Sequence, residues 1–297
     1  MPTRTDDEIR ASVSRAYGER VRPVLERIDL AAAPANGAAC CGPDCCEPAA
    51  AETIALFDVT PAGSAASCCE TSDASNGCCG TDADDLDISN IARLYASTDL
   101  TDLPSSVTDV AFGCGNPTAI AAMLPGETVL DLGSGGGIDC FLAAKMVGET
   151  GRVYGVDMTA EMIALSRKNA AKLGAPNVEF RLGEIEHLPI GDASIDVIIS
   201  NCVINLSPDK DQVFREAYRV LRPGGRLQVS DMVWTKPVPD EVKGDMEQWA
   251  DCIAGALLES EYLGKIEAAG FSDVSSISAE HPGGKGIASA NVVAFKA

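Results

Sequence analysis

Cysteine is the residue type that stands out in this sequence. The chain of 297 residues contains 12 cysteines but only 2 histidines. Zinc sites and catalytic sites in cytosolic proteins usually combine these two kinds of side chain. Thiolates are soft ligands, and structural disulfides are rare in a reducing compartment. Thiols in this number therefore indicate capture of a metal or metalloid, or redox chemistry.

Eight of the cysteines form four neighbouring pairs in one segment, residues 31–85. The pairs are Cys40-Cys41, Cys45-Cys46, Cys68-Cys69 and Cys78-Cys79. The segment is rich in Ala, Gly, Ser, Pro and Asp and sustains neither a helical nor a strand period, which is typical of a disordered-like linker. The pairs also lack the ligand spacing of common zinc sites.

The other four cysteines lie outside this segment. Cys140 has apolar neighbours in a predicted helix, so we expect a small, buried core side chain. Cys114 stands between two glycines in a sharply bent loop that would present its thiol. Cys202 follows a predicted strand, and Cys252 lies in a predicted helix that can fold over the same sheet edge. Taken singly, each is more often a core residue than a ligand.

A glycine-rich run follows a predicted apolar strand. It reads Asp131-Leu132-Gly133-Ser134-Gly135-Gly136-Gly137. Glycines at every second position let the backbone turn tightly and approach a ligand at a helix N-terminus. Dinucleotide-binding proteins usually have the spacing G-x-G-x-x-G, and position 138 is Ile138. The run alone indicates a nucleotide-like cofactor and leaves nicotinamide cofactors open.

Two further groups follow in the order expected of a cofactor site. Asp157 and Met158 end the next predicted strand, where a carboxylate can bind the ribose of an adenosine or cap the following helix. Glu184 and Ile185 follow the third strand, where methyltransferases of this fold place groups beside the adenine. If the cofactor is S-adenosylmethionine, the usual donor of such methyltransferases, Asp131 would hydrogen-bond near its methionine end. Otherwise Asp131 would cap the glycine loop.

The elements that must position these residues alternate between strands and helices. Strands are predicted at 128–132, 152–156, 178–181, 195–200 and 226–230, and a closing hairpin at 274–278 and 291–296. Parallel strands joined by helices bind ligands at their carboxyl ends. We expect an α/β fold with a Rossmann-type, mostly parallel, seven-stranded sheet and an antiparallel edge strand.

The remaining sequence divides the chain into five predicted segments. They are an N-terminal amphipathic helix in 1–30, the Cys-rich low-complexity linker 31–85, a lid and Cys114-loop segment 86–125, the cofactor-binding core 126–235, and C-terminal helices at 242–258 and 261–269 with the closing hairpin in 236–297. The apolar stripe of the first helix, predicted over 5–28, is read as core packing. The expected fold includes an N-terminal helical lid, and the short pieces predicted in 86–125 are lid-like.

The charge excludes some partners. A net charge of -21 and a pI of about 4.4 give a surface that repels phosphate backbones, so we expect no nucleic-acid partner. No run approaches the roughly 18 apolar residues of a membrane helix, and the first residues lack the apolar core of a signal peptide. We expect a cytoplasmic protein with no membrane partner.

Taken together, these motifs resemble the arsenite methyltransferases. The resemblance covers residues 111 to about 271. It rests on Gly113-Cys114-Gly115, the glycine run, Gly155-Val156-Asp157-Met158-Thr159, Ser200-Asn201-Cys202-Val203-Ile204-Asn205-Leu206 and the Cys252 helix. The run 201–206 with Pro208-Asp209-Lys210 is highly specific, whereas the glycine run fits many methyltransferases.

The resemblance implies a role for each motif. Cys114, Cys202 and Cys252 would be the catalytic thiolates that bind trivalent arsenic, and S-adenosylmethionine would be the methyl donor. The implied cofactor-binding residues are Asp131, Gly133, Ser134, Gly135, Asp157, Met158, Glu184, Ile185 and Asn201. The activity would be methylation of arsenite and methylarsenite for detoxification. It needs no general base, because the arsenic lone pair has no proton to lose.

The resemblance also implies redox chemistry. Methylation formally oxidises arsenic, so a thiol pair could reduce it again and leave a disulfide for an external thiol reductant, thioredoxin or glutathione, to reopen. The family usually has a further upstream cysteine that pairs with the Gly-Cys-Gly cysteine, and Cys78 or Cys79 is the nearest candidate. Phe112 stands where relatives often carry tyrosine. The neighbouring pairs either capture arsenite or belong to a dispensable insert.

Two other functions stay open. One is a methyltransferase for a quinone or other small organic acceptor, in which the cysteines are incidental. The other is a thiol-rich protein that sequesters a metal or metalloid and whose methyltransferase-like domain is inactive. The intact cofactor motifs argue against the second.

Overall fold

The computed structural model of this chain describes residues 5–32, 95, 100, 102–111, 122–239, 253–280 and 286–297. The chain divides into one unit formed by Met1–Ala31 and Leu86–Ala297 and a second unit, Ala32–Asp85. All eight cysteines of the four neighbouring pairs lie outside the described residues, as do Cys114, Cys252 and Phe112. The division into five segments stays a prediction.

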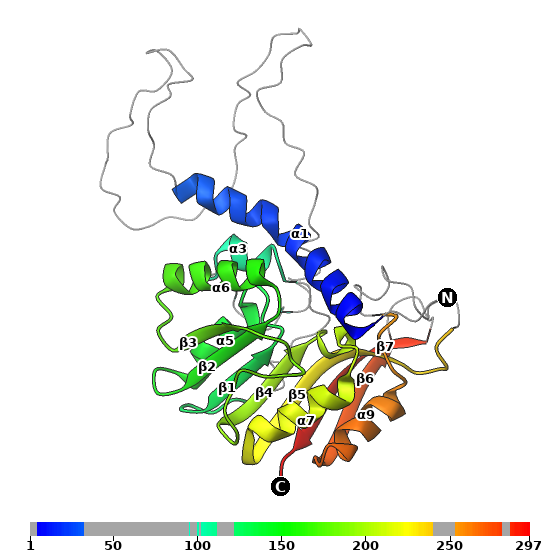
Figure 1. Cartoon of the computed structure of the whole chain (residues 1–297). Helices are drawn as coiled ribbons and strands as arrows, with labels where there is room; N and C mark the ends of the chain where they lie inside the picture. Colours follow the sequence, from blue (N-terminus) through cyan, green and yellow to red (C-terminus); the bar gives the residue numbers. More distant parts are fainter. Residues whose placement is uncertain are drawn as a thin grey trace, which may run out of the picture. The chain divides into compact units, whose positions relative to one another are not determined.

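A seven-stranded sheet forms the centre of the described fold (Figure 1). Its strands are β1 (Thr128–Leu132), β2 (Arg152–Asp157), β3 (Val178–Leu182), β4 (Ile195–Asn201), β5 (Leu221–Trp234), β6 (Ser272–Glu280) and β7 (Ile287–Phe295), in the order β3-β2-β1-β4-β5-β7-β6. The first five strands are parallel, whereas β7 is antiparallel to both β5 and β6. The predicted Rossmann-type sheet and closing hairpin are confirmed, with β6 outermost.

Helices cover both faces of this sheet. The described helices are α1 (Asp6–Ala32), α3 (Ser105–Thr108), α5 (Ile138–Val147), α6 (Ala160–Leu173), the short 3-10 helix η1 (Ile204–Leu206), α7 (Lys210–Val220) and α9 (Glu259–Ala268). Parallel strands need crossover connections, and the helices in these connections bury both sheet faces. This explains why the strands read as nearly continuous apolar runs.

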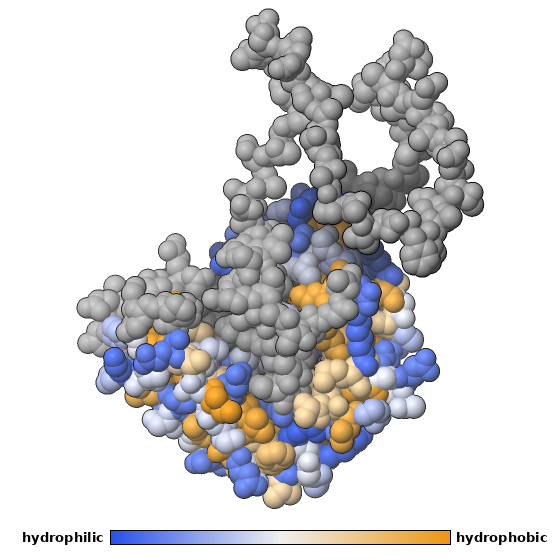
Figure 2. Space-filling model, turned by 180° about the vertical axis from the view of Figure 1, so that it is seen from behind, coloured by the Kyte–Doolittle hydropathy of each residue, from blue (hydrophilic) through white to orange (hydrophobic). Residues whose placement is uncertain are grey.

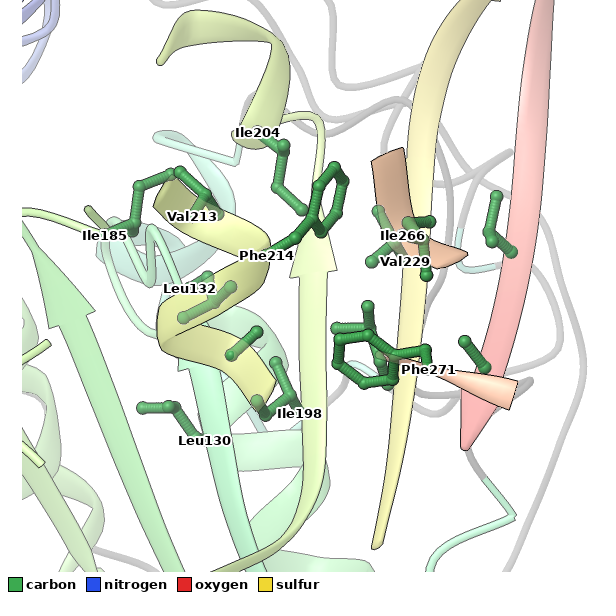
Figure 3. Close-up of a cluster of buried hydrophobic side chains, with 14 of the residues drawn as sticks. Leu130, Leu132, Ile185, Ile198, Ile204, Val213, Phe214, Val229, Ile266 and Phe271 are labelled. Carbon is green, nitrogen blue, oxygen red and sulfur yellow. The ribbon is translucent and has the colours of Figure 1, made fainter. Parts of the chain in front are cut away.

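The side chains of each strand alternate between the two faces of the sheet, and this alternation divides the hydrophobic core into two clusters. Val129 of β1 packs with Phe141 of α5 on one face. Its neighbour Leu130 belongs to the cluster with Phe214 of α7 and Ile266 of α9 on the other face, which Figure 3 shows in close-up. Because successive side chains of a strand point to opposite faces, one short strand anchors both helical layers.

Two predicted elements differ from the structure. Strand β5 begins at Leu221, before the predicted start at 226, because Pro223-Gly224-Gly225 lies within the strand as an irregularity; the pairing with β4 shifts there. The helix predicted to end at 258 is wrong over its described end. Residues 253–255 form a bend and a turn, and Leu258 makes an isolated bridge to Trp234.

The surface of the described part mixes polar and apolar side chains. Figure 2 shows hydrophilic and hydrophobic residues interspersed on the face that it presents, instead of one continuous apolar band. Over the described ranges, none of the helices has the length and apolar character needed to cross a membrane.

Candidate functional site

The glycine loop turns at the carboxyl end of β1. Gly133, Gly135 and Gly137 have φ angles of 70°, 50° and 98°, in the left-handed region that favours glycine. A Cβ atom on Gly133 would lie 2.3 Å from a methyl group of Val203, whereas one on Gly135 would meet no described atom within 4 Å. Gly133 therefore allows close packing against the segment after β4, and Gly135 borders open space.

That open space is a pocket of about 940 Å³, its solvent-filled mouth included. Eight of the predicted site residues line it: Gly133, Ser134, Gly135, Asp157, Met158, Ile185, Asn201 and Cys202. The topology brings these residues together because they follow the carboxyl ends of β1, β2, β3 and β4, which meet at one edge of the sheet. Asp131 and Glu184 are predicted site residues that do not line the pocket.

Asp157 joins the glycine loop to the start of α6. Its carboxylate accepts hydrogen bonds from the main-chain N–H groups of Gly135 at 3.0 Å and Thr159 at 2.8 Å. Burial raises the pKa of Asp157 above its ordinary value, and these two N–H donors oppose that rise. The N-cap of α6 is Thr159, whose side chain makes no cap hydrogen bond, so Asp157 orders the residue before the helix without capping the helix itself, and it lines the pocket.

Asp131 lies behind the loop. Its side chain is 2% exposed and accepts a hydrogen bond from the thiol of Cys140, with the sulfur 3.2 Å from the carboxylate oxygen. Burial, together with the neighbouring Asp139, raises the pKa of Asp131 well above its ordinary value. Cys140 is a free, buried thiol, so its predicted place in the core is confirmed. Burial also raises the pKa of this thiol, which makes it unreactive.

The structure adds two pocket residues that sequence reasoning missed, Tyr95 and Asp139. The Tyr95 hydroxyl donates to both carboxylate oxygens of Asp139, at 3.0 and 3.1 Å, and the Asn201 amide donates to Asp139 at 3.3 Å. Burial raises the pKa of Asp139 to about 6, and these hydrogen bonds oppose the rise. The detectable signal was a carboxylate among apolar residues at the start of the helix that directly follows the glycine loop.

Helix α1 contributes a third wall of the pocket. Arg10, Val13 and Tyr17 line it, so the helix does more than the predicted core packing. The Arg10 Nε donates to a carboxylate oxygen of Glu186 at 3.2 Å, and the Ser207 hydroxyl donates to the same oxygen at 2.7 Å. The buried Glu186 therefore connects α1 to the segment that follows η1.

Cys202 is the one predicted arsenic ligand among the described residues. It follows β4, is 5% exposed and lines the pocket with the glycine loop. Its φ angle is 58°, and its main-chain N–H donates to the Ser230 carbonyl oxygen at 2.8 Å. Cys202 is disulfide-bonded, so the structure describes the oxidised form of this thiol.

The sheet order and the glycine loop place this chain in the class of Rossmann-type methyltransferase domains. The sequence profile of a methyltransferase domain family matches residues 124–270. An arsenite methyltransferase of Halobacterium salinarum is 53% identical over 199 residues, which are 67% of this chain and 50% of that protein. A ubiquinone/menaquinone biosynthesis C-methyltransferase of Haemophilus ducreyi is 35% identical over 118 residues, 39% of this chain and 45% of that protein.

A solved structure extends the likeness. The crystal structure of an arsenic(III) S-adenosylmethionine methyltransferase from Chlamydomonas reinhardtii matches with a TM-score of 0.60 and 38% identity, covering 67% of this chain and 72% of that chain. The chain spans about half the length of the curated relatives it matches. It belongs to the arsenite methyltransferase family.

Proposed function

We propose that this chain transfers methyl groups from S-adenosylmethionine to trivalent arsenic, taken as arsenite or methylarsenite. The observation that carries the proposal is the position of Cys202, which lines the same pocket as the glycine loop. A soft thiolate ligand beside a cofactor loop is the arrangement that methylation of a soft acceptor requires. The names of the relatives support the same acceptor.

The residues of the pocket fit S-adenosylmethionine. The hydroxyl of Ser134 is buried, lines the pocket and has no hydrogen-bond partner among the described residues, so a polar ligand group would satisfy it. Gly135 leaves free space beside it. Asp157 and Met158 would hold the ribose side, with Glu184 and Ile185 beside the adenine. The donor supplies an activated methyl group on a sulfonium.

The acceptor side of the proposal uses thiolates. Cys202 would bind arsenic together with Cys114 and Cys252, which lie outside the described residues. Three thiolates leave the arsenic lone pair free, and that pair forms the new As–C bond while the C–S bond electrons return to sulfur. The protein contributes alignment and exclusion of water, and no side chain has to accept a proton.

The oxidised state of Cys202 supports a need for an external thiol reductant. A cysteine in a disulfide offers no thiolate, so the bond must be reduced before arsenic binds. We propose thioredoxin or glutathione for this step. A cytoplasmic location, where such reductants are abundant, and a role in arsenic detoxification belong to the same proposal.

The experiment is product analysis with two acceptors. The full chain, a thiol reductant and S-adenosylmethionine are incubated with arsenite or with a reduced quinone, and the products are separated and identified by mass spectrometry. We expect methylated arsenicals and S-adenosylhomocysteine with arsenite alone. Methylated quinone without methylated arsenic would favour the alternative acceptor, which the Haemophilus relative supports. Cofactor binding without any methylated arsenic would contradict the proposal.

A further inference from the structure

The segment that begins with Cys202 is held in a conformation that cysteine rarely adopts. At a φ of 58°, the backbone of Cys202 lies in the left-handed region. Such a conformation costs on the order of 1–3 kcal/mol and persists only where the surroundings enforce it. Contacts made by residues 203–207, directly after this cysteine, must therefore hold this conformation in place.

Two buried side chains, one basic and one acidic, hold that backbone. Lys210, the first residue of α7, is 7% exposed, and Asp231 in β5 is fully buried. The Lys210 Nζ donates to the main-chain oxygens of Asn205 at 3.2 Å and Ser207 at 2.9 Å. The Asp231 carboxylate accepts from the main-chain N–H of Asn205. The lysine thus binds the carbonyl groups of this segment, and the aspartate binds one of its N–H groups.

The contacts of Asp231 tie this segment to the rest of the fold. The Tyr262 hydroxyl of α9 donates to Asp231 at 3.1 Å, and the main-chain N–H of Met232 donates to it at 3.1 Å. The Asn205 side chain donates to the Met232 carbonyl oxygen at 2.6 Å. The segment after Cys202 is therefore joined to β5 through the Asn205 backbone and side chain.

Lys210 stands where a lysine is costly for the helix itself. A cation at a helix N-terminus is opposed by the helix dipole, and burial removes the hydration of its ammonium group. The apolar side of the segment is already packed, since Ile204 lies against Phe214 of α7 (Figure 3). An apolar residue would avoid both costs but would leave the Asn205 and Ser207 carbonyl oxygens without these hydrogen bonds, so the donors and charge of the lysine serve the segment it binds.

We propose that Lys210 and Asp231 are positioning residues for Cys202, which hold residues 203–207 so that the thiol stays on the pocket wall beside the glycine loop. The consequence for arsenic binding rests on the function proposed above. The positioning itself is a statement about one thiol, and it is tested without arsenic.

The test compares the alkylation rates of two thiols in one protein. The full chain is reduced with a phosphine and treated with iodoacetamide, and the peptides that contain Cys202 and Cys140 are followed by mass spectrometry. Lys210→Met keeps the apolar stem and removes the charge and donors. We expect Cys202 to be labelled about tenfold faster and the labelling rate of Cys140 to stay unchanged. A tenfold ratio corresponds to a loss of about 1.4 kcal/mol in the free energy of local opening.

Two control variants accompany Lys210→Met. Lys210→Arg keeps the charge and donors, so we expect it to restore slow labelling of Cys202. Arg226→Met breaks a partly buried ion pair of β5, in which the guanidinium lies 2.6 Å from a Glu127 carboxylate oxygen. We expect this change to lower stability without selective labelling of Cys202.

Several outcomes would overturn the proposal. Equal acceleration at Cys202 and Cys140 would show global loosening only, and no acceleration at Cys202 would show that the pair does not position it. If Lys210→Met does not fold, Asp231→Asn takes its place with the same expected result. If Lys210→Met and Asp231→Asn both misfold while Arg226→Met folds, Lys210 and Asp231 are required for the whole fold and not for positioning Cys202 alone.

A second readout separates this proposal from the proposed function. In the Lys210→Met variant we expect the KM for arsenite to rise about tenfold and the Kd for the cofactor to rise less, because Cys202 directly precedes the released segment, whereas Gly133 only packs against Val203 in it. If the wild-type chain methylates no arsenite, the KM measurement fails together with the proposed function. The alkylation rate of Cys202 relative to Cys140 still decides whether Lys210 and Asp231 position Cys202.

Discussion

Single residues set the shape of the cofactor side of the pocket, and the glycine loop shows this most clearly. Gly133 and Gly135 share a left-handed backbone, yet their surroundings differ. The space beside Gly133 is filled by Val203, and the space beside Gly135 is open. One glycine is needed for packing and the other for room in the pocket, a distinction that the sequence pattern does not reveal.

Alanine at these two glycines is expected to have separable effects. Gly135→Ala should cost about 1 kcal/mol in backbone strain and raise the Kd for S-adenosylmethionine about tenfold, because the methyl group enters the pocket. Gly133→Ala should lower the free energy of unfolding by about 1–3 kcal/mol through overpacking against Val203. Calorimetric titration measures the Kd for S-adenosylmethionine, and urea unfolding measures the free energy of unfolding. Equal cofactor affinity in Gly135→Ala and wild type would contradict this assignment.

Asp139 should give the stability of the protein a pH dependence. Its pKa rises from 3.8 to about 6 on folding, mainly through burial, so the folded state binds more protons than the unfolded state in this window. Stability from this group is therefore lost as pH rises from about 4 to 6. Asp139→Asn should lose less stability over that range in urea unfolding. An identical pH profile in both proteins would refute the prediction.

At the scale of elements, α1 closes one side of the pocket. Val21 and Val24 pack with Met162 and Leu165 of α6, which fixes the helix on the core. Arg10 then reaches Glu186 beside the predicted adenine loop. The helix therefore joins the wall of the cofactor site through Arg10, which lies 3.2 Å from a Glu186 oxygen and 3.7 Å from a Glu184 oxygen, and its apolar stripe does not predict these contacts.

Removing that ion pair should weaken cofactor binding. In Arg10→Met the carboxylate of Glu186 stays buried without its cation, and we expect the Kd for S-adenosylmethionine to rise about tenfold. Arg22→Met is the matched control, because Arg22 is 58% exposed and its nitrogen lies 4.0 Å from a Glu161 oxygen. The control should change stability and Kd little. Equal Kd values in the two variants would rule out this role of Arg10.

The sequence predicted the elements better than the detailed contacts. Continuous apolar runs located the strands, and the order of the motifs brought Gly133, Asp157 and Cys202 to one edge. The start of β5 was missed because Pro223-Gly224-Gly225 also reads as a turn, and pairing with β4 overrides that local preference. Tyr95 was missed because its contact with Asp139 joins residues far apart in the chain.

At the scale of the whole molecule, the chain combines a methyltransferase domain with a Cys-rich segment outside the described residues. The domain holds the cofactor loop and Cys202, on which the proposed methyl transfer depends. The sequence leaves two interpretations of the cysteine pairs at 40–79, capture of arsenite or a dispensable insert. They differ in what the pairs contribute at low arsenic.

Deleting residues 33–80 separates these interpretations. If the pairs capture arsenite, the deletion should raise the arsenite concentration needed for half-maximal methylation while the rate at saturation stays close to that of the full chain. Replacing all eight cysteines by serine in the full-length chain is the matched control and should have the same effect. An unchanged half-saturation value in both proteins would end the capture hypothesis.

The most direct test of the central claim is single-turnover transfer of a labelled methyl group from S-adenosylmethionine to arsenite by the fully reduced chain. We predict labelled methylarsenic with the wild type, a rate at least about 10²-fold lower with Cys202→Ser, and a nearly unchanged rate with Cys140→Ser. A wild-type chain that binds the cofactor but labels no arsenic would contradict the account. So would a Cys202→Ser variant that transfers methyl at the wild-type rate.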